Sequence, residues 1–270
     1  MKKIIILAFA LFAVMACSED DSRIFDKTAN ERIFENKKEF FDKLTNDNWI
    51  IELFPGATEE FGGFAIFADF SEDYKVNLVN EFSMKKAGTA YDVISRDGSL
   101  LTFNEYNEAM HVFSQPDIDN PKGQLKTVDY EFIYVKSVGD ILYTKGVKTS
   151  NSIRFVKTDL SPEEYFNRQK DVNDFINKTG RIVTQFLVNG KALEFQFGTG
   201  GFGKIFEYTV TSMVEKDGKE VEEKELFKNA FVYTDRGIRF YTNIEGTEVF
   251  ELILDKENNV LKSEDGKVEL

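Results

Sequence analysis

The sequence predicts an α+β fold that is mainly antiparallel β-structure, arranged as two tandem helix-then-sheet sub-domains that could also pack as one unit. Short apolar and aromatic runs bounded by turn residues follow one another without helices between them, which is typical of antiparallel sheets. Phenylalanine supplies 27 residues and proline only four, a balance that favours a folded chain rich in strands. Residues 26–47 and 161–177 add two segments with helical spacing and capping residues.

The first predicted sub-domain covers residues 26–158 and begins with the helix at 26–47. Thr28 and Glu31 have the spacing of a capping box, and apolar residues recur behind them at helical intervals. Strand-like runs then continue to the end of this half. They lie at residues 48–54, 63–70, 74–82, 91–95, 100–103, 129–136, 140–145 and 152–157.

The second predicted sub-domain covers residues 159–270 and repeats this order. Ser161 can cap a helix, Pro162 suits its first position, Glu164 completes a capping box, and Gly180 ends the helical pattern. The hairpin turns are expected at Asn189-Gly190 and Asp235-Arg236-Gly237. Further strands are expected at residues 181–188, 192–197, 204–214, 225–233, 237–241, 247–254 and 260–262.

Residues 1–16 have the three parts of a bacterial export signal. Lys2 and Lys3 form a positive start, an apolar run follows from Ile4 to Val14, and the small residue Ala16 precedes the expected cleavage point. A membrane-spanning helix needs about 20 apolar residues, and this run is shorter. We therefore expect residues 1–16 to be a signal peptide and residues 17–25 to form an acidic tether.

The only cysteine, Cys17, stands directly after this signal in the sequence VMAC, which resembles a lipobox. A lone thiol in an exported protein cannot form an internal disulfide, and acylation gives it a function. We therefore predict that Cys17 is lipidated and anchors the chain to a bilayer; the alternative is a cleaved secretory signal that happens to end in cysteine. Glu19, Asp20 and Asp21 resemble a surface-export signal of lipoproteins, with a solvated tether as the alternative.

The charge balance argues against nucleic acid as a partner. The formal net charge is −13, and the lysines are scattered among carboxylates instead of forming a basic stripe. The glycine-rich segment at residues 198–203, followed by Lys204, fits the spacing of nucleotide-binding loops. The residues after it are aromatic and β-branched, however, and predict a strand where a nucleotide site needs a helix. We therefore expect a loop between strands and no cofactor.

The sequence also contains a single histidine, a single tryptophan, an acidic loop and several carboxylate pairs. His111 is the only histidine and is interpreted as structural, and Trp49 is expected to pack in the core. Asp117, Asp119 and Asn120 have calcium-like spacing but lack the other EF-hand positions, so an acidic turn is favoured and no metal site is predicted. Carboxylate pairs that could serve acid and base chemistry occur at 59–60, 163–164 and 222–223.

Six segments of the chain carry a resemblance to a known family. They are FDKTANERI (25–33), WIIELFPG (49–56), GGF (62–64), TFNEYN (102–107), HVFSQP (111–116) and DYEF (129–132). Together they resemble one family of Bacteroidetes lipoproteins, catalogued as domain of unknown function 4302. The similarity covers nearly all of the chain after the leader and is strongest over residues 25–157. The resemblance implies a lipoprotein of the cell envelope, associated with nutrient-uptake loci of the outer membrane, and it implies no catalytic residue.

The sequence therefore predicts a protein of the outer membrane, anchored to the bilayer through Cys17 and facing the cell exterior. We expect it to be a non-enzymatic binding or accessory component of nutrient uptake, working with outer-membrane uptake proteins and a glycan or peptide ligand. A structural or adhesion protein of the envelope is the alternative. A hydrolase that uses paired carboxylates is a third hypothesis, and no known constellation of catalytic residues supports it.

Overall fold

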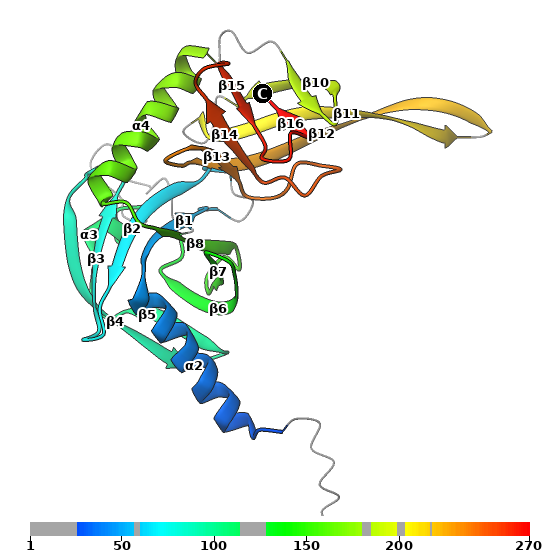
Figure 1. The fold of residues 1–270 in the computed structure, drawn as a ribbon. Helices are drawn as coiled ribbons and strands as arrows, with labels where there is room; N and C mark the ends of the chain where they lie inside the picture. The colour runs from blue at the N-terminus through cyan, green and yellow to red at the C-terminus, as the bar shows by residue number, and fades with distance from the viewer. Residues whose placement is uncertain (1–25, 57–59, 114–127, 180–184, 199–202, 217) are drawn as a thin grey trace, which may run out of the picture.

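The structure, a computed structural model, describes residues 26–56, 60–113, 128–179, 185–198, 203–216 and 218–270, and these form two closed barrels of eight strands each (Figure 1). The prediction of antiparallel β-structure is confirmed. The predicted fold class, an α+β arrangement of two tandem helix-then-sheet sub-domains, is wrong, because the described residues form two closed barrels, with 49% of these residues in strands and 19% in helices. Strand periodicity shows which side chains face inward, but it does not show that the last strand pairs with the first.

The first barrel takes its strands in chain order and closes where β1 pairs with β8. On β1, Trp49, Ile51 and Leu53 face the barrel core, whereas Ile50 belongs to a cluster shared with the second barrel. The two faces of β1 therefore serve two different cores. The strands are β1 (Asn48–Leu53), β2 (Phe64–Phe70), β3 (Lys75–Asn80), β4 (Lys86–Ser95), β5 (Ser99–Phe103), β6 (Glu131–Val138), β7 (Ile141–Gly146) and β8 (Ser152–Thr158).

Helix α2 (Ala29–Asn46) packs against strands β4 and β5 of the first barrel. It begins with the predicted capping box, in which the Thr28 hydroxyl accepts from the Glu31 backbone and the Glu31 carboxylate accepts from the Thr28 backbone. Phe40 and Leu44 are fully buried, and the Phe40 ring stacks on Tyr134 with the ring centroids 4.6 Å apart. The last turns of α2 therefore belong to the core of the first barrel.

The second barrel closes where β9 pairs with β16, a two-residue strand that the sequence pattern does not predict. Helix α4 (Pro162–Thr179) precedes this barrel, and its predicted capping box between Ser161 and Glu164 is present. Its strands are β9 (Phe186–Val188), β10 (Lys191–Phe197), β11 (Ile205–Lys216), β12 (Lys219–Tyr233), β13 (Gly237–Phe240), β14 (Glu251–Asp255), β15 (Val260–Lys262) and β16 (Val268–Glu269).

A third hydrophobic cluster joins the two barrels. It contains Ile50 and Phe67 from the first barrel, Tyr165 and Phe166 from α4, and Val232 from the second barrel. Side chains from three parts of the chain are thus buried together between the barrels. The predicted boundaries of the two sub-domains, 26–158 and 159–270, stay predictions.

Charged residues are buried at the same interface. Glu52 of β1 is fully buried and accepts hydrogen bonds from Arg154 of the first barrel, at 2.7 Å, and from Arg239 of the second. Arg154 also donates to the backbone oxygen of Phe240 at 2.7 Å. A buried charge is tolerated only when partners compensate for its lost hydration, so Glu52 ties the two barrels together.

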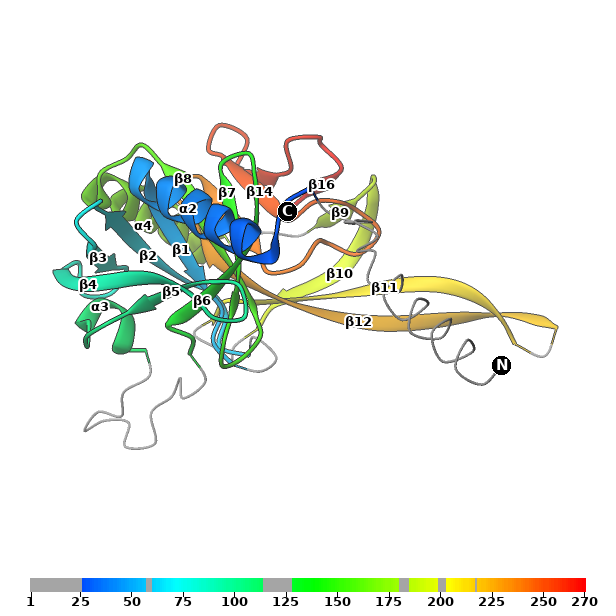
Figure 2. The same cartoon turned by 90° about the horizontal axis from the view of Figure 1, so that it is seen from below.

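Strands β11 and β12 continue far beyond the second barrel as a two-stranded ribbon (Figures 1 and 2). Their pairing runs from Ile205 opposite Ala230 to Lys216 opposite Lys219. Among the described helices, none combines the length and the apolar composition that a membrane-spanning helix requires.

Candidate functional site

The predicted lipidation site, Cys17, and the predicted export residues, Glu19, Asp20 and Asp21, lie outside the residues that the structure describes. Their roles stay predictions. The signal peptide and the acidic tether, residues 1–16 and 17–25, lie outside the described part as well. The candidate site therefore comes from the part of the chain that the structure describes.

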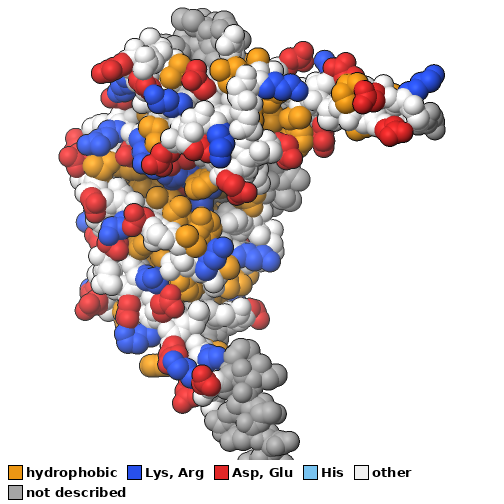
Figure 3. Space-filling model, turned by 45° about the vertical axis from the view of Figure 1, so that its right-hand side comes forward, with side chains coloured by type: hydrophobic (Ala, Val, Ile, Leu, Met, Phe, Trp, Pro, Cys, Tyr) orange, Lys and Arg blue, Asp and Glu red, His pale blue; other side chains and the backbone are white. Residues whose placement is uncertain are grey.

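Two hollows, of about 590 and 460 Å³, adjoin each other where α4 passes the second barrel and reaches the first. Both are bordered by Arg168, Asp235 and Arg236, and we call the two together the α4 groove. One end is lined by Asp171, Val172, Ile253, Leu254, Asp255, Lys256 and Lys262, and the other by Val138, Ile141, Tyr165, Phe250 and other residues of both barrels. Figure 3 shows hydrophobic side chains gathered at the waist between the barrels, with charged side chains around them.

Helix α4 places Arg168 at the groove because the neighbouring faces of the helix are buried. Tyr165 and Val172 are almost fully buried, and Gln169 donates a hydrogen bond of 2.8 Å to the backbone oxygen of Tyr233. These contacts fix the rotation of the helix about its axis. Arg168 comes three residues after Tyr165 and four before Val172, so it lies at the edge of the buried helix face, where its exposed side chain borders the groove.

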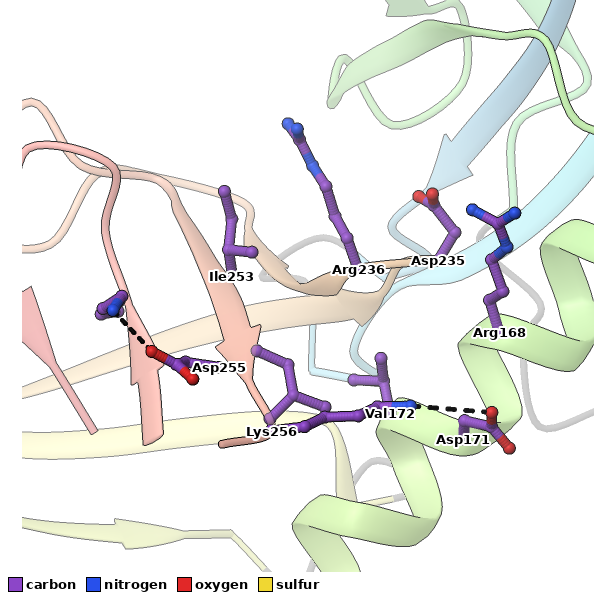
Figure 4. Close-up of a pocket in the computed structure, with 10 residues that line it drawn as sticks. Arg168, Asp171, Val172, Asp235, Arg236, Ile253, Asp255 and Lys256 are labelled. Atoms are coloured by element: carbon purple, nitrogen blue, oxygen red, sulfur yellow. Dashed lines mark hydrogen bonds and ion pairs between the residues drawn. The ribbon is translucent and has the colours of Figure 1, made fainter. Parts of the chain in front are cut away.

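The turn between β12 and β13 supplies Asp235 and Arg236. The Thr234 hydroxyl accepts hydrogen bonds from the backbone N–H groups of Arg236, at 3.3 Å, and Gly237, at 3.0 Å. A Cβ atom at Gly237 would lie 1.9 Å from the backbone oxygen of Leu252, so only glycine fits there. The hairpin predicted at this turn is confirmed. In Figure 4, Asp235 and Arg236 rise from the turn and Arg168 rises from α4.

Glu251 is held by two arginines. Arg236 contacts both of its carboxylate oxygens, at 3.1 and 2.6 Å, and Arg239 donates to it at 2.6 Å. Burial acts to raise the pKa of Glu251, but the attraction of Arg239 and Arg236 outweighs burial and lowers it. Glu251 is therefore a fixed anion that orients the two arginines.

Arg168 and Asp235, in contrast to Glu251, have no ion-pair partner among the described residues. Both side chains border both hollows. Asp235 is half-buried, and burial raises its pKa although Arg236 and Arg239 oppose the shift. The centre of the groove thus holds two charged groups without ion-pair partners. The guanidinium of Arg168 can donate hydrogen bonds, and the partly desolvated carboxyl of Asp235 can accept them.

Arg239 forms part of the groove wall that is shared with the interface between the barrels. Its guanidinium binds Glu52 and Glu251, and its Nε is the one buried side-chain polar atom without a hydrogen-bond partner among the described residues. A buried donor without a partner raises the energy of the folded state by roughly 1–3 kcal/mol.

The far end of the groove carries weaker ion pairs. Lys262 contacts Asp255 at 2.6 Å, and Lys256 lies 3.8 Å from Asp171, as the dashed lines in Figure 4 mark. All but Asp255 are about half exposed or more, so water screens these pairs and each contributes little to stability. Their ammonium and carboxylate groups remain accessible to a polar ligand.

A separate hollow of about 440 Å³ lies on another side of α4. Phe82 is 58% exposed and Met84 is 42% exposed at its rim, and exposed amide side chains of α4 lie around them. Lys204 is buried beneath it, where its ammonium group binds Glu81 and donates to the backbone oxygen of Gly63 at 2.9 Å. The buried charges of Lys204 and Glu81 therefore already satisfy each other within the protein.

The structure also shows where several other candidate residues of the sequence lie. Lys204 is followed by strand β11, as predicted, and its side chain is buried. Residues 199–202 of the predicted glycine loop lie outside the described residues. His111 ends the short helix α3 (Glu108–His111), and its Nδ1 lies 3.1 Å from the backbone nitrogen and 3.0 Å from the backbone oxygen of Asn107. Its structural role stays a prediction. Trp49 is 3% exposed and packs in the core, as predicted. The acidic loop at residues 117–120 lies outside the described residues.

The comparison with protein families matches residues 21–256 to the family described as "Domain of unknown function (DUF4302)". The chain belongs to the DUF4302 family. The resemblance to domain of unknown function 4302 is thereby confirmed, whereas the assignment to lipoproteins of Bacteroidetes stays a prediction. No curated protein and no solved structure matches the chain significantly. The DUF4302 match includes Arg168, Asp235, Arg236 and Glu251, so the centre of the α4 groove lies within the family domain.

Sequence reasoning did not identify the α4 groove of this DUF4302 protein. It did recognise Asp235-Arg236-Gly237, but as a hairpin turn, and it placed Arg168 on a helix without assigning it a role. One signal was present in the sequence, since charged residues at a tight turn are candidates for a binding surface. Their meeting at one groove depends on how α4 packs on the barrel, which no local pattern encodes.

Proposed function

We propose that this DUF4302 protein is a lipid-anchored binding protein of the outer membrane that holds an extended glycan or peptide segment in the α4 groove. In this proposal Cys17 carries the anchor, and Glu19, Asp20 and Asp21 direct the protein to the outer face. The bound segment is presented to uptake proteins in the same membrane.

The observation that carries the proposal is the unpaired Arg168 and Asp235 at the centre of a long groove. Other charged side chains of the groove, such as Glu251, Asp255 and Lys262, already have partners. A ligand with alternating donors and acceptors, such as sugar hydroxyls or peptide amides, can satisfy both groups at once. Hydrogen bonds to charged groups contribute about 1.5–3 kcal/mol each, enough for specific recognition.

The groove also has the length and mixed surface that such a segment needs. Its two hollows together offer space for several sugar or peptide units. The exposed Val138 and the half-buried Phe250 give an apolar surface at one end, and Lys256 and Asp255 give polar groups at the other. A structural or adhesion role in the envelope is the alternative, and it requires no ligand at this position.

A hydrolase is a second candidate for a specific reason. The pKa of Asp235 is raised and that of Glu251 is lowered, and both residues border one hollow, which is the pattern of an acid and base pair. Against this reading, Arg236 and Arg239 hold both oxygens of Glu251, which weakens it as a base or nucleophile. Binding without chemistry is therefore the proposal that fits both residues.

Calorimetric titration of the chain from Ser18 onward with neutral oligosaccharides and short peptides tests the proposal. We expect one of these classes to bind, and Arg168→Gln and Asp235→Asn to weaken binding by about 10- to 100-fold each, which corresponds to about 1.4–2.7 kcal/mol. Lys170→Gln is the matched control, because Lys170 lies on the same helix but borders the separate hollow.

Three results would contradict binding in the α4 groove. If Lys170→Gln weakened binding and Arg168→Gln did not, the ligand would occupy the separate hollow instead. If the unaltered protein cleaved a glycoside or peptide and Asp235→Asn abolished the cleavage, the hydrolase would replace the binding protein. Absence of binding to every probe would favour the structural or adhesion role.

A further inference from the structure

The outer part of the β11–β12 ribbon consists of two strands alone. Strand β10 pairs with β11 only as far as Thr209, and β13 pairs with β12 only from Phe231 onward. Beyond these points the hairpin projects from the molecule (Figure 2). An isolated two-stranded hairpin is marginally stable in water, so this length of paired strand gains stability from an additional strand.

The geometry of β11 shows which backbone groups face its outer edge. The carbonyl of Ile205 accepts from the Gly198 backbone at 2.7 Å, and the carbonyl of Thr211 accepts from Lys191 Nζ at 3.3 Å, so both point away from β12. Backbone groups alternate in direction along a strand. The N–H and C=O groups of Met213 therefore point outward too, and within the described chain no strand pairs with them.

The two edges of the ribbon differ in charge. Along β11, residues 208–214 read YTVTSMV, which is uncharged and rich in strand-forming residues. Along β12, residues 219–225 read KEVEEKE, in which every residue but one is charged. Charged edge strands resist pairing with other chains, whereas uncharged ones promote it. The β11 edge thus lacks the protection that the β12 edge has.

We propose that the outer edge of β11 pairs antiparallel with the same edge of a second copy of this chain, about a two-fold axis at Ser212. In this register Thr211 lies opposite the partner's Met213, and Val210 lies opposite the partner's Val214. The two ribbons then form one four-stranded sheet with β12 strands at both outer edges. The proposal concerns assembly and does not depend on ligand binding in the α4 groove.

Charge is the reason for choosing a second copy as the occupant. When β11 pairs with β11 of the second copy, the uncharged residues 208–214 of the two chains lie opposite each other, so no like charges meet. Pairing of β12 with its own copy would instead bring Glu222 and Glu223 of one chain close to the same glutamates of the other. A two-fold interface uses one patch twice, and only the β11 edge is compatible with itself in this way.

Cysteine cross-linking tests the register. In the proposed sheet Ser212 faces the partner's Ser212 in a non-hydrogen-bonded pair, where the Cα atoms lie about 4.5 Å apart, a separation that permits a disulfide. In the chain from Ser18 onward, which lacks Cys17, we expect Ser212→Cys to form a disulfide-linked dimer under mild oxidation. Glu223→Cys is the matched control, because Glu223 is the cross-strand neighbour of Ser212 on β12. It should remain mainly monomeric.

Proline substitution tests the edge without a new covalent bond. Met213 and Glu222 are opposite each other in the ribbon, and the N–H groups of both point outward, so proline at either position removes no bond between β11 and β12. By sedimentation equilibrium over a dilution series we expect the unaltered chain to reach twice the monomer mass. Met213→Pro should stay at the monomer mass, and Glu222→Pro should behave like the unaltered chain.

Three outcomes would overturn the proposal. The first is an unaltered chain that stays monomeric at every concentration, and the second is equal loss of dimer in both proline variants. The third is a dimer that survives Met213→Pro and gives no cross-link through Ser212→Cys, because such a dimer would use another surface.

Discussion

The two barrels have the same number of strands and the same kind of closure, yet their surroundings differ. The first barrel is covered by the end of α2, and the side chains of Phe40 and Leu44 are completely buried there. The second barrel carries the projecting β11–β12 ribbon and lies beside α4, which leaves a groove along one side. Similar strand architecture thus carries a covering helix in the first half, and a projecting ribbon and most of the α4 groove's charged centre in the second.

This difference indicates that barrel closure stabilises both halves of the molecule. The β11–β12 ribbon and helix α4, which are added to the second barrel, provide the surfaces suited to binding. A closed barrel has no free edges and satisfies its own backbone groups, so it needs nothing from outside. Open edges and unpaired charges are concentrated in the second half, at the ribbon and at the α4 groove. The predictions below test how far the two halves are coupled.

The largest expected effect comes from truncating a core phenylalanine in either barrel. Phe155 in the first barrel and Phe206 in the second are both fully buried, and replacing either with alanine should lower the free energy of unfolding by about 3–5 kcal/mol. Because the barrels share a buried cluster, we expect one unfolding transition in each variant.

The single tryptophan makes this measurable. Trp49 lies in the first barrel, so its fluorescence reports unfolding there, while circular dichroism reports both barrels. In the Phe206→Ala variant the two probes should give the same, lowered denaturation midpoint. A Trp49 midpoint that stayed at its original value would show that the barrels unfold independently. Phe34→Ala is the control, because Phe34 is 68% exposed.

A somewhat smaller effect is expected from Glu52→Gln at the interface. The change leaves Arg154 and Arg239 buried without their shared anion, and the loss should be about 3 kcal/mol, near the lower end for a broken buried ion pair. Glu131→Gln is the control, since its pair with Arg96 is partly exposed and should be worth no more than about 1 kcal/mol. Equal losses in the two variants, measured by urea denaturation, would contradict a coupling role for Glu52.

Local patterns in the sequence predicted elements well and architecture poorly. The capping residues at Thr28 and Ser161 located both long helices, and strand alternation located nearly every strand, because both signals depend on neighbouring residues. The fold class failed because closure depends on pairs far apart in the chain, such as β1 with β8. The length of the ribbon was also underestimated. Strand β12 begins at Lys219 and not at residue 225, because the charged residues 219–224 do not have the pattern of a strand.

The candidate site was less accessible to sequence reasoning. Cys17 and the acids after it could be predicted because export signals are linear motifs, and these predictions still await a test. The groove could not, because Arg168 and Asp235 come from elements far apart in the chain that meet only through tertiary packing. Glu52 carried no signal either, since a glutamate among apolar strand residues does not show that two arginines will surround it.

The smallest expected effect, Asp235→Asn, separates function from stability in the open half of the molecule. Burial raises the pKa of Asp235 in the folded state, so folding favours the protonated carboxyl. The stability that this group contributes is present at pH values below its unfolded pKa and is lost as the pH rises through the folded pKa. At neutral pH the carboxylate is therefore slightly unfavourable for folding, and neutral asparagine should stabilise the protein, by no more than about 0.5 kcal/mol.

Thermal unfolding of this variant and the unaltered chain across an acidic-to-neutral pH series checks the sign. The difference in stability should grow as the pH rises through the titration of Asp235 and then level off. Asp171→Asn is the control, because the Asp171 side chain is 67% exposed and should show no such trend. A variant that is less stable at neutral pH would mean that the fold uses the charge of Asp235. In that case the residue would be structural, and the proposal that its unpaired carboxyl awaits a ligand would lose its main support.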